Sequence, residues 1–453
     1  MAETPNNWHA DAVHSAKRQF IDIMGVSILG AADESTSKVF ETVEGWGDGP
    51  CTAIGRKRTL SAPWAALVNG TAAHALDLDD NFDPVKTHAT AVLAPAIIAL
   101  GEQEKSSGHD CLDAYICGLQ IMGRVGQGVN PTHRNRGWHA TATVGAIGAA
   151  AACARLLKLS AKQAANAVSL STSMAAGFMS QFGTMAKPIH AGLAAKSGVV
   201  AASMARKGIT AGRDTLDGPT GMNRLMVGPD YEELRDAITN PEHGQTLRFE
   251  TESIGEPLLI LDNGFRVKRF PNCGSAHRAM DALSLLKEKH RFSVNDVSKV
   301  TVCLPRTHLN NLMHHDPKDP MQAKFSLQYG LAVVLETGGC ALHDFTPEAV
   351  MRPEMRSLYK VIEANPVDKS EGRFPTSVEV HLKSGVTLEK SLAMPLGSKA
   401  APFTDEQYWK KFDDCVGILI TPGELTKVKQ HLEGLQHLQD LTLIMAPLRK
   451  SMA

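Results

Sequence analysis

Two stretches, VSKVTVCLP at 297–305 and TSVEVHLKSGVTLEKSLAM at 376–394, decide the fold because they alternate apolar and polar residues around β-branched types. That alternation predicts strands, and Lys383-Ser384-Gly385 is a favourable hairpin turn inside the second stretch. Segments with helical spacing, such as AHRAMDALSLLKEKH, lie beside them. We therefore predict an α+β domain that contains both stretches.

The rest of the chain has a helical pattern. Apolar residues recur at helical spacing near the N-terminus, where Gly30 is a plausible stop, and Ser160 with Gln163 forms a capping box. The fold class predicted is mainly α with an inserted α+β domain. The predicted domains are a large helical one, 1–261 plus 397–453, and a smaller α+β one, 262–396.

Composition indicates an ordinary globular protein. Of 453 residues, 43% are hydrophobic and 21% charged, which excludes a disordered chain. Lys and Arg number 47 against 48 Asp and Glu, so the formal charge of −1 argues against a nucleic-acid partner. The eight cysteines form no C-x-x-C pair, and the first residues lack a signal-peptide pattern. We expect a cytoplasmic protein with reduced thiols.

No segment has the composition of a membrane span, so we expect no membrane partner. The uncharged stretches 140–154 and 163–186 are rich in Ala, Gly, Ser and Thr, and we predict tightly packed buried helices there.

The sequence lacks three common motifs for phosphate binding, a nucleophilic serine and zinc binding. It contains no G-x-x-x-x-G-K-[ST], no G-x-S-x-G and no H-E-x-x-H pattern. His308, His314, His315 and Asp316 lie close in sequence but lack the fixed spacing of metal ligands. We therefore expect neither a metal nor a cofactor.

The segment HALDLDDNFDPVKTHATAV at 74–92 is rich in groups that can transfer protons. Asp77, Asp79 and Asp80 precede His88, so a carboxylate can orient this histidine as an acid or base. The alternative is a solvated helix terminus.

Two further segments carry single polar groups in apolar surroundings. In RGWHATATVGAIGAAA, His139 opens a predicted uncharged helix, whose N-terminus attracts anions; the alternative is a hydrogen-bonded core histidine. In FGTMAKPIHAG, Lys187 is the first charged residue after Lys162. A buried ammonium needs an anion, which is either a structural carboxylate or a ligand.

A fourth segment, FRVKRFPNCGSAHRAMDA at 265–282, groups Lys268, Arg269, Cys273 and His277 around a proline turn. A charged domain hinge is the alternative reading. Together the four segments supply histidines, lysines and a carboxylate. This set suits proton transfer on a small anionic carboxylate: lysines bind the carboxylates and stabilise developing charge, and histidines move the proton.

In their order, GWHATATVGAIGAAA, GTMAKPIHAGLAAKSG, VKRFPNCGSAH, AKFSLQYG and GSKAAPFTDEQYWKKFDDC resemble the MmgE/PrpD family. That family includes 2-methylcitrate dehydratase, cis-aconitate decarboxylase and iminodisuccinate epimerase. The resemblance implies a two-domain fold with a helical domain and an α+β lid, a homodimer, and a metal-free pocket between the domains. It also implies a pocket lined by matching residues: catalytic His88, His139, Lys187 and Lys268, and substrate-binding Asp77 and Tyr329. We expect Asn81 and His277, from the neighbouring segments, to bind substrate as well.

The sequence departs from the decarboxylase branch in two places. Asn81 stands where those enzymes tend to have Thr, and Cys273 where they tend to have His. The resemblance implies a cofactor-independent lyase acting on a di- or tricarboxylate, similar to 2-methylcitrate dehydratase or cis-aconitate decarboxylase. The alternatives are an epimerase of an iminodisuccinate-like dicarboxylate and a non-catalytic dimeric binding protein.

If His139 moves the proton, the activity should show a pH limb at about 6 to 7.

Overall fold

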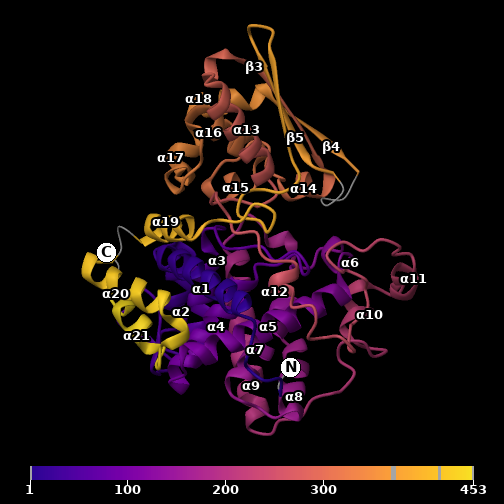
Figure 1. Ribbon diagram of the computed structural model, residues 1–453, viewed down its shortest axis with the longest axis vertical. Helices are drawn as coiled ribbons and strands as arrows, with labels where there is room; N and C mark the ends of the chain where they lie inside the picture. The colour runs from indigo at the N-terminus through magenta and orange to yellow at the C-terminus, as the bar shows by residue number, and fades with distance from the viewer. Residues whose placement is uncertain (1–2, 369–373, 417–419, 451–453) are drawn as a thin grey trace. The chain divides into compact units, whose positions relative to one another are not determined.

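The computed structural model describes residues 3–368, 374–416 and 420–450 (Figure 1). The chain divides into two compact units, Met1–Phe265 with Thr404–Ala453, and Arg266–Phe403. The predicted domain bounds stay a prediction, because grouping residues by contact does not test whether either part folds alone.

The first unit is helical apart from a two-residue ladder of β1 (Cys51–Thr52) and β2 (Thr59–Leu60). Its helices are α1 (Ala10–Gly30), α2 (Glu34–Val43), α3 (Ala62–Ala75), α4 (Ala89–Glu104), α5 (Gly108–Val129), α6 (Thr132–Asn135), α7 (Thr143–Leu156), α8 (Ala161–Thr172), α9 (Ala186–Arg206), α10 (Met222–Val227), α11 (Tyr231–Asp236), α12 (Leu259–Asp262), α19 (Asp405–Val416), α20 (Pro422–Glu433) and α21 (Thr442–Met445).

Glycines let the central helices of the first unit approach closely. A Cβ atom built on Gly70 in α3 would lie 2.7 Å from the Cα of Gly192 in α9. One built on Gly198 of α9 would lie 2.4 Å from the Cβ of Ala149 in α7. Helices α3, α7 and α9 therefore pack backbone against backbone, which carries the start of α9 to the end of α3.

The C-terminal segment returns to the first unit, as its helical pattern predicts. Lys411 of α19 forms an ion pair of 2.7 Å with Asp22 of α1, and both side chains are buried. The predicted capping box of Ser160 and Gln163 is confirmed at the start of α8.

Two helix predictions are wrong. His139 does not open a helix, because α7 begins four residues later, at Thr143. The His139 carbonyl accepts hydrogen bonds from the amides of Ala142 and Thr143, in the turn that leads into α7. The stretch 163–186 is not one buried helix either: α8 ends at Thr172, and Gly183, at φ 84°, adopts a left-handed conformation that stops a helix. None of the helices in the described ranges is long and apolar enough to cross a membrane.

The second unit contains a four-stranded mixed sheet in the order β4-β3-β5-β6. Its strands are β3 (Val297–Pro305), β4 (Ile362–Val367), β5 (Thr376–Leu382) and β6 (Thr387–Leu392). Strand β3 pairs parallel with β4 and antiparallel with β5. Both predicted strand stretches thus share one sheet, and Gly385, at φ 90°, completes the predicted hairpin turn.

Helices complete the core of the second unit. They are α13 (His277–His290), α14 (Arg306–Asn311), α15 (Pro320–Ala323), α16 (Leu327–Thr337), α17 (Pro347–Val350) and α18 (Pro353–Leu358). Val300, Val302, Val378 and Val380 are fully buried in a core shared with α13 and α16. Figure 1 shows these two helices beside the sheet.

Candidate active site

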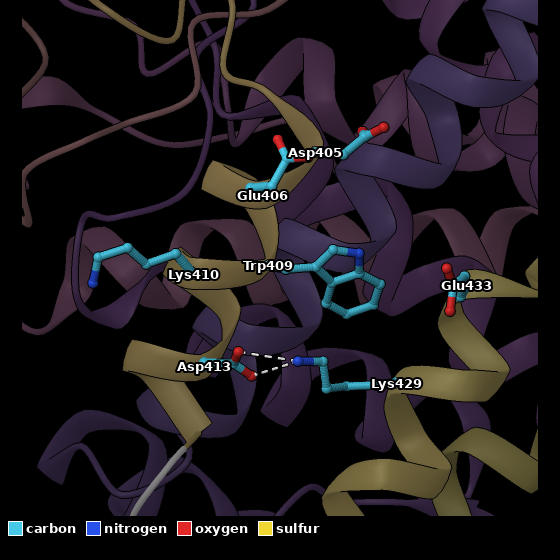
Figure 2. A pocket seen from close by; sticks show the side chains of 7 residues that line it. All are labelled: Asp405, Glu406, Trp409, Lys410, Asp413, Lys429 and Glu433. Carbon is cyan, nitrogen blue, oxygen red and sulfur yellow. Dashed lines mark hydrogen bonds and ion pairs between the residues drawn. The ribbon is translucent and has the colours of Figure 1, made fainter.

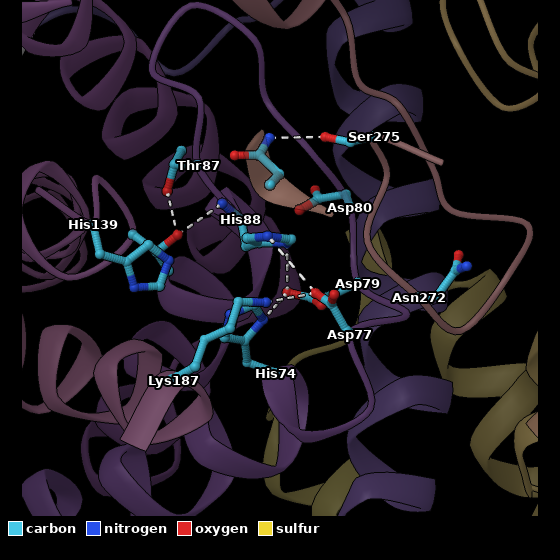
Figure 3. Close-up of polar contacts among 12 residues, drawn as sticks. His74, Asp77, Asp79, Asp80, Thr87, His88, His139, Lys187, Asn272 and Ser275 are labelled. Atoms are coloured by element: carbon cyan, nitrogen blue, oxygen red, sulfur yellow. Dashed lines mark hydrogen bonds and ion pairs between the residues drawn. The ribbon is translucent and has the colours of Figure 1, made fainter. Parts of the chain in front are cut away.

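Three predicted site residues, Asp77, His88 and Lys187, meet in the first unit (Figure 3). Helix α3 ends at Ala75, and Asp77 adopts a left-handed backbone conformation at φ 53°, which turns the chain out of the helix. The chain then reaches His88, which directly precedes α4. Lys187 comes from the first turn of α9.

Lys187 and Asp77 form a buried ion pair. The Lys187 Nζ lies 2.7 Å from the Asp77 Oδ1, and the two side chains are 5% and 4% exposed. The same ammonium lies 5.4 Å from the centre of the Phe182 ring, which is within reach of a cation–π interaction. Of the two alternatives for this lysine, the structure shows the carboxylate partner.

Asp79 is the carboxylate nearest to His88. The Nδ1 of His88 lies 3.2 Å from the Asp79 Oδ2, whereas its Nε2 lies 3.9 Å from the Asp77 Oδ1. The Nδ1 of His74, a residue that sequence reasoning did not single out, lies 2.8 Å from the same Asp79 oxygen. Burial raises the pKa of Asp79, but the charges and hydrogen bonds of His74 and His88 outweigh it and hold the pKa well below its ordinary value.

Asp80, next in the chain, behaves in the opposite way. Its carboxylate accepts from the amide and hydroxyl of Thr90, whose hydroxyl lies 2.6 Å from the Tyr115 hydroxyl. Burial without a cationic partner raises the pKa of Asp80 to about 7. The pKa values of these two adjacent aspartates therefore shift in opposite directions, because of the two only Asp79 contacts imidazoles.

His139 is buried beside this cluster and pairs with His190. Their Nδ1 atoms are 2.9 Å apart, so one of the two nitrogens carries a hydrogen and the other accepts it. Burial, followed by the charges of His74 and Lys187, holds the pKa of His139 well below its ordinary value. A pH limb at 6 to 7 is therefore not expected from His139, which corrects the sequence-based expectation. His190 follows Lys187 by three residues, a helical spacing that could have identified it.

Asn81 belongs to the same loop as Asp77 and is partly exposed. The other predicted residues belong to the second unit. Lys268 is 1% exposed, and the His277 Nε2, at the start of α13, lies 3.3 Å from the Asn272 carbonyl oxygen. Tyr329 lies in the core of that unit, where its hydroxyl donates to the Asp344 carbonyl. The predicted substrate-binding role of Tyr329 stays a prediction, and the observed contact gives it a structural role.

Four groups in the first unit have the donor atoms of a metal site. One nitrogen or oxygen from each of His74, Asp77, Asp79 and His88 lies within 4.8 Å of the others. Nitrogen and carboxylate ligands of this kind suit a zinc-type ion. In the structure the Lys187 ammonium is the cation that contacts Asp77. His308, His314, His315 and Asp316 lie close in sequence but lack the fixed spacing of metal ligands. In the structure Asp316 pairs with Lys318 and Arg356.

We call His74, Asp77, Asp79, His88 and Lys187 the histidine cluster. A surface pocket between α19 and α20 shares no residue with it (Figure 2). Lys429 there forms an ion pair of 3.0 Å with Asp413 and lies 5.1 Å from the Trp409 ring centre. Acidic groups form most of the remaining lining. The described residues that line it include no histidine that could transfer a proton near neutral pH, so the histidine cluster is the better candidate for the active site.

Comparisons with known proteins identify the family of this chain. The MmgE/PrpD N-terminal domain matches residues 2–234, which include the whole histidine cluster, and the MmgE/PrpD C-terminal domain matches residues 270–433. The chain is 26% identical over 452 residues to the cis-aconitate decarboxylase of Homo sapiens, covering 96% of this chain and 90% of the relative. It is 24% identical over 449 residues to that of Mus musculus, covering 95% and 88%. It is 25% identical over 461 residues to that of Aspergillus terreus, covering 96% and 91%. With both domains matched, the chain belongs to the MmgE/PrpD family.

Proposed function

We propose that this protein is a cofactor-independent lyase that acts on a small di- or tricarboxylate. The observation that carries the proposal is the contact of His88 with Asp79, beside the buried pair of Lys187 and Asp77. This arrangement places a proton-transfer group next to a cation. Family membership and relatives named cis-aconitate decarboxylase support the same class of reaction.

His88 is the proposed acid and base. The His88 Nδ1 lies 3.2 Å from Asp79 without hydrogen-bond geometry. With Asp79 ionised, that contact is attractive when Nδ1 carries a hydrogen, and Nε2 is then the unprotonated nitrogen that accepts a proton. The His88 side chain is 13% exposed, which makes it more accessible than His74, whose side chain is fully buried. A general base of this kind contributes about 10²–10⁴-fold to a rate.

Lys187 is the proposed electrostatic group. A carbon next to a carboxylate loses or gains a proton more easily when a fixed positive charge stabilises the developing anion. Removal of a proton followed by loss of a hydroxyl is dehydration. Loss of carbon dioxide followed by return of a proton from His88 is decarboxylation. We propose Lys268 as a further catalytic group and Tyr329 as a substrate contact on the family resemblance, and Asn81 and His277 as substrate contacts from their place in the sequence segments that carry the site. We propose His139 as a neutral neighbour of the reacting groups.

One experiment separates the reactions. The protein is incubated in deuterated water with citrate, methylcitrate, cis-aconitate and iminodisuccinate, and NMR follows the loss of each compound and its deuterium uptake. Elimination or decarboxylation of one compound supports the lyase. Deuterium uptake with inversion and no elimination supports the epimerase. If no compound changes and the His88→Asn variant behaves identically, the lyase proposal is wrong, and calorimetric titration with the same compounds then tests the non-catalytic binder.

The assembly and cellular location are also proposals. We propose a homodimer and a cytoplasmic protein, as the family resemblance and the N-terminal sequence predict. Light scattering during size-exclusion chromatography tests the first.

A further inference from the structure

One oxygen of Asp79 receives two imidazoles. The Nδ1 of His74 lies 2.8 Å from the Asp79 Oδ2, and the Nδ1 of His88 lies 3.2 Å from the same atom. An ionised carboxylate can only accept hydrogen bonds. The contact of His74 is a hydrogen bond, whereas the His88 Nδ1 approaches the oxygen without hydrogen-bond geometry. Each contact is attractive only when its Nδ1 carries a hydrogen, so both contacts favour that tautomer.

His74 is suited to donate permanently rather than to exchange protons. Its side chain is completely buried at the end of α3. Burial, together with the charges of Lys187 and His88, lowers the pKa of His74 to about 3 although Asp79 opposes the shift. The ring therefore stays neutral over the working pH range of an enzyme, and its Nδ1–H remains a donor.

The carboxylate of Asp79 needs such a donor to keep its orientation. Among the described residues, the other Asp79 oxygen, Oδ1, has no hydrogen-bond partner although it is buried. Without the bond to His74, only the contact with His88 would hold the carboxylate, and rotation of the group would exchange its two oxygens. The ring of His74 also lies against that of His88, with centroids 4.3 Å apart, and so restricts its rotation.

We propose that His74 is a positioning residue that acts through Asp79: its Nδ1–H holds the carboxylate, and the carboxylate in turn favours the His88 tautomer with a hydrogen on Nδ1 and an unprotonated Nε2. This inference deepens the proposed function, because it rests on His88 as the proton-transfer group. Partners that orient a functional histidine through its second nitrogen typically change activity by about 10–100-fold when they are removed.

The proposal predicts a change in pH dependence as well as in rate. The hydrogen that His74 donates withdraws negative charge from Asp79. Loss of that donor makes Asp79 a stronger partner for protonated His88, so the pKa of His88 rises. The acid limb of kcat/KM, which reports this group in the free enzyme, should then move to higher pH. A residue that only fills space would leave the limb in place.

Two variants separate donation from packing. His74→Phe keeps an aromatic ring but removes the donor, whereas the amide nitrogen of His74→Asn can take the place of Nδ1. We expect His74→Phe to lower kcat by about 10–100-fold, with KM nearly unchanged and the acid limb moved upward. His74→Asn should recover most of kcat and the wild-type limb. Normal kcat with an unmoved limb in His74→Phe would overturn the proposal, as would an equal defect in both variants.

A spectroscopic measurement makes the test independent of turnover and of the stability of one variant. With ¹⁵N-labelled histidine, the signals of His88 are assigned from their loss in His88→Asn. We expect a protonated Nδ1 and an unprotonated Nε2 in the wild type and in His74→Asn, and a mixture of tautomers in His74→Phe. If His74→Phe does not fold, the other two proteins still test the proposal. A hydrogen on the His88 Nε2, in the wild type or in His74→Asn, would refute it. If the tautomers agree but no carboxylate is converted, the proposed function fails and the positioning role stands.

Discussion

Replacement of Lys187 by methionine should strongly destabilise the first unit. The ammonium lies 2.7 Å from the Asp77 Oδ1, and neither side chain is more than 5% exposed. Removing one partner of a buried pair leaves an uncompensated charge, which typically costs about 3–5 kcal/mol of unfolding free energy.

The Asp77→Asn variant is the matched control. Asn tolerates a left-handed conformation, so the change removes the charge without straining the backbone at φ 53°. Alone it should also destabilise the unit by about 3–5 kcal/mol. In the double variant no charge is left unpaired, so the loss should be smaller than the sum of the two single losses by about 2–3 kcal/mol, a coupling typical of groups in direct contact.

Tryptophan fluorescence during urea unfolding is the assay. All five tryptophans, Trp8, Trp46, Trp64, Trp138 and Trp409, belong to the first unit, so their signal reports that unit alone. Losses below about 1 kcal/mol in both single variants would match a solvated surface pair and contradict the reasoning. Additive losses in the double variant would show that the two groups do not interact.

Three further predictions concern the neighbouring groups. His88→Asn should lower kcat by about 10²–10⁴-fold with little change in KM, whereas His139→Asn should leave the acid limb of the pH profile unmoved, because the pKa of His139 is already well below the physiological range. Asp80 binds its proton more tightly in the folded protein, with a pKa of about 7 against an ordinary 3.8. Between these values the native state holds more protons, so stability should fall as pH rises, and fluorescence-detected unfolding should show a weaker fall in Asp80→Asn. Exhaustive dialysis against EDTA should leave activity intact; a loss restored by one divalent ion would instead make His74, Asp77, Asp79 and His88 a metal site.

The sequence predicted those parts of the fold whose pattern is local. Strand β3 alternates buried and exposed positions because one face packs on helices, and its bounds match the predicted 297–305. Strand β4 was missed. Its sequence, IEANPV, contains Asn365 and Pro366, which disfavour a strand. Proline is tolerated there because β4 is the edge of the sheet, where one side of the strand makes no ladder hydrogen bonds.

For the site, sequence reasoning identified the groups but not their pairing. Asp77, Asp79 and His88 lie within one short loop, so their proximity could be expected. The partner of Lys187 could not, because Asp77 is 110 residues away. That pairing depends on the approach of α9 to α3, where a Cβ atom on Gly192 would lie 2.2 Å from the Leu67 carbonyl oxygen.

The packing of two helices thus determines the electrostatics of the cluster. Because Gly70 and Gly192 admit backbone contact, the first turn of α9 reaches the loop that follows α3, and its ammonium neutralises Asp77. Asp79 is then the carboxylate left for the two imidazoles, and its charge state follows from their hydrogen bonds. With Asp77 paired to Lys187 and Asp79 in contact with two imidazoles, the more exposed imidazole, that of His88, is the one we propose to exchange a proton with a substrate. That division of partners favours His88 over His139 as the base.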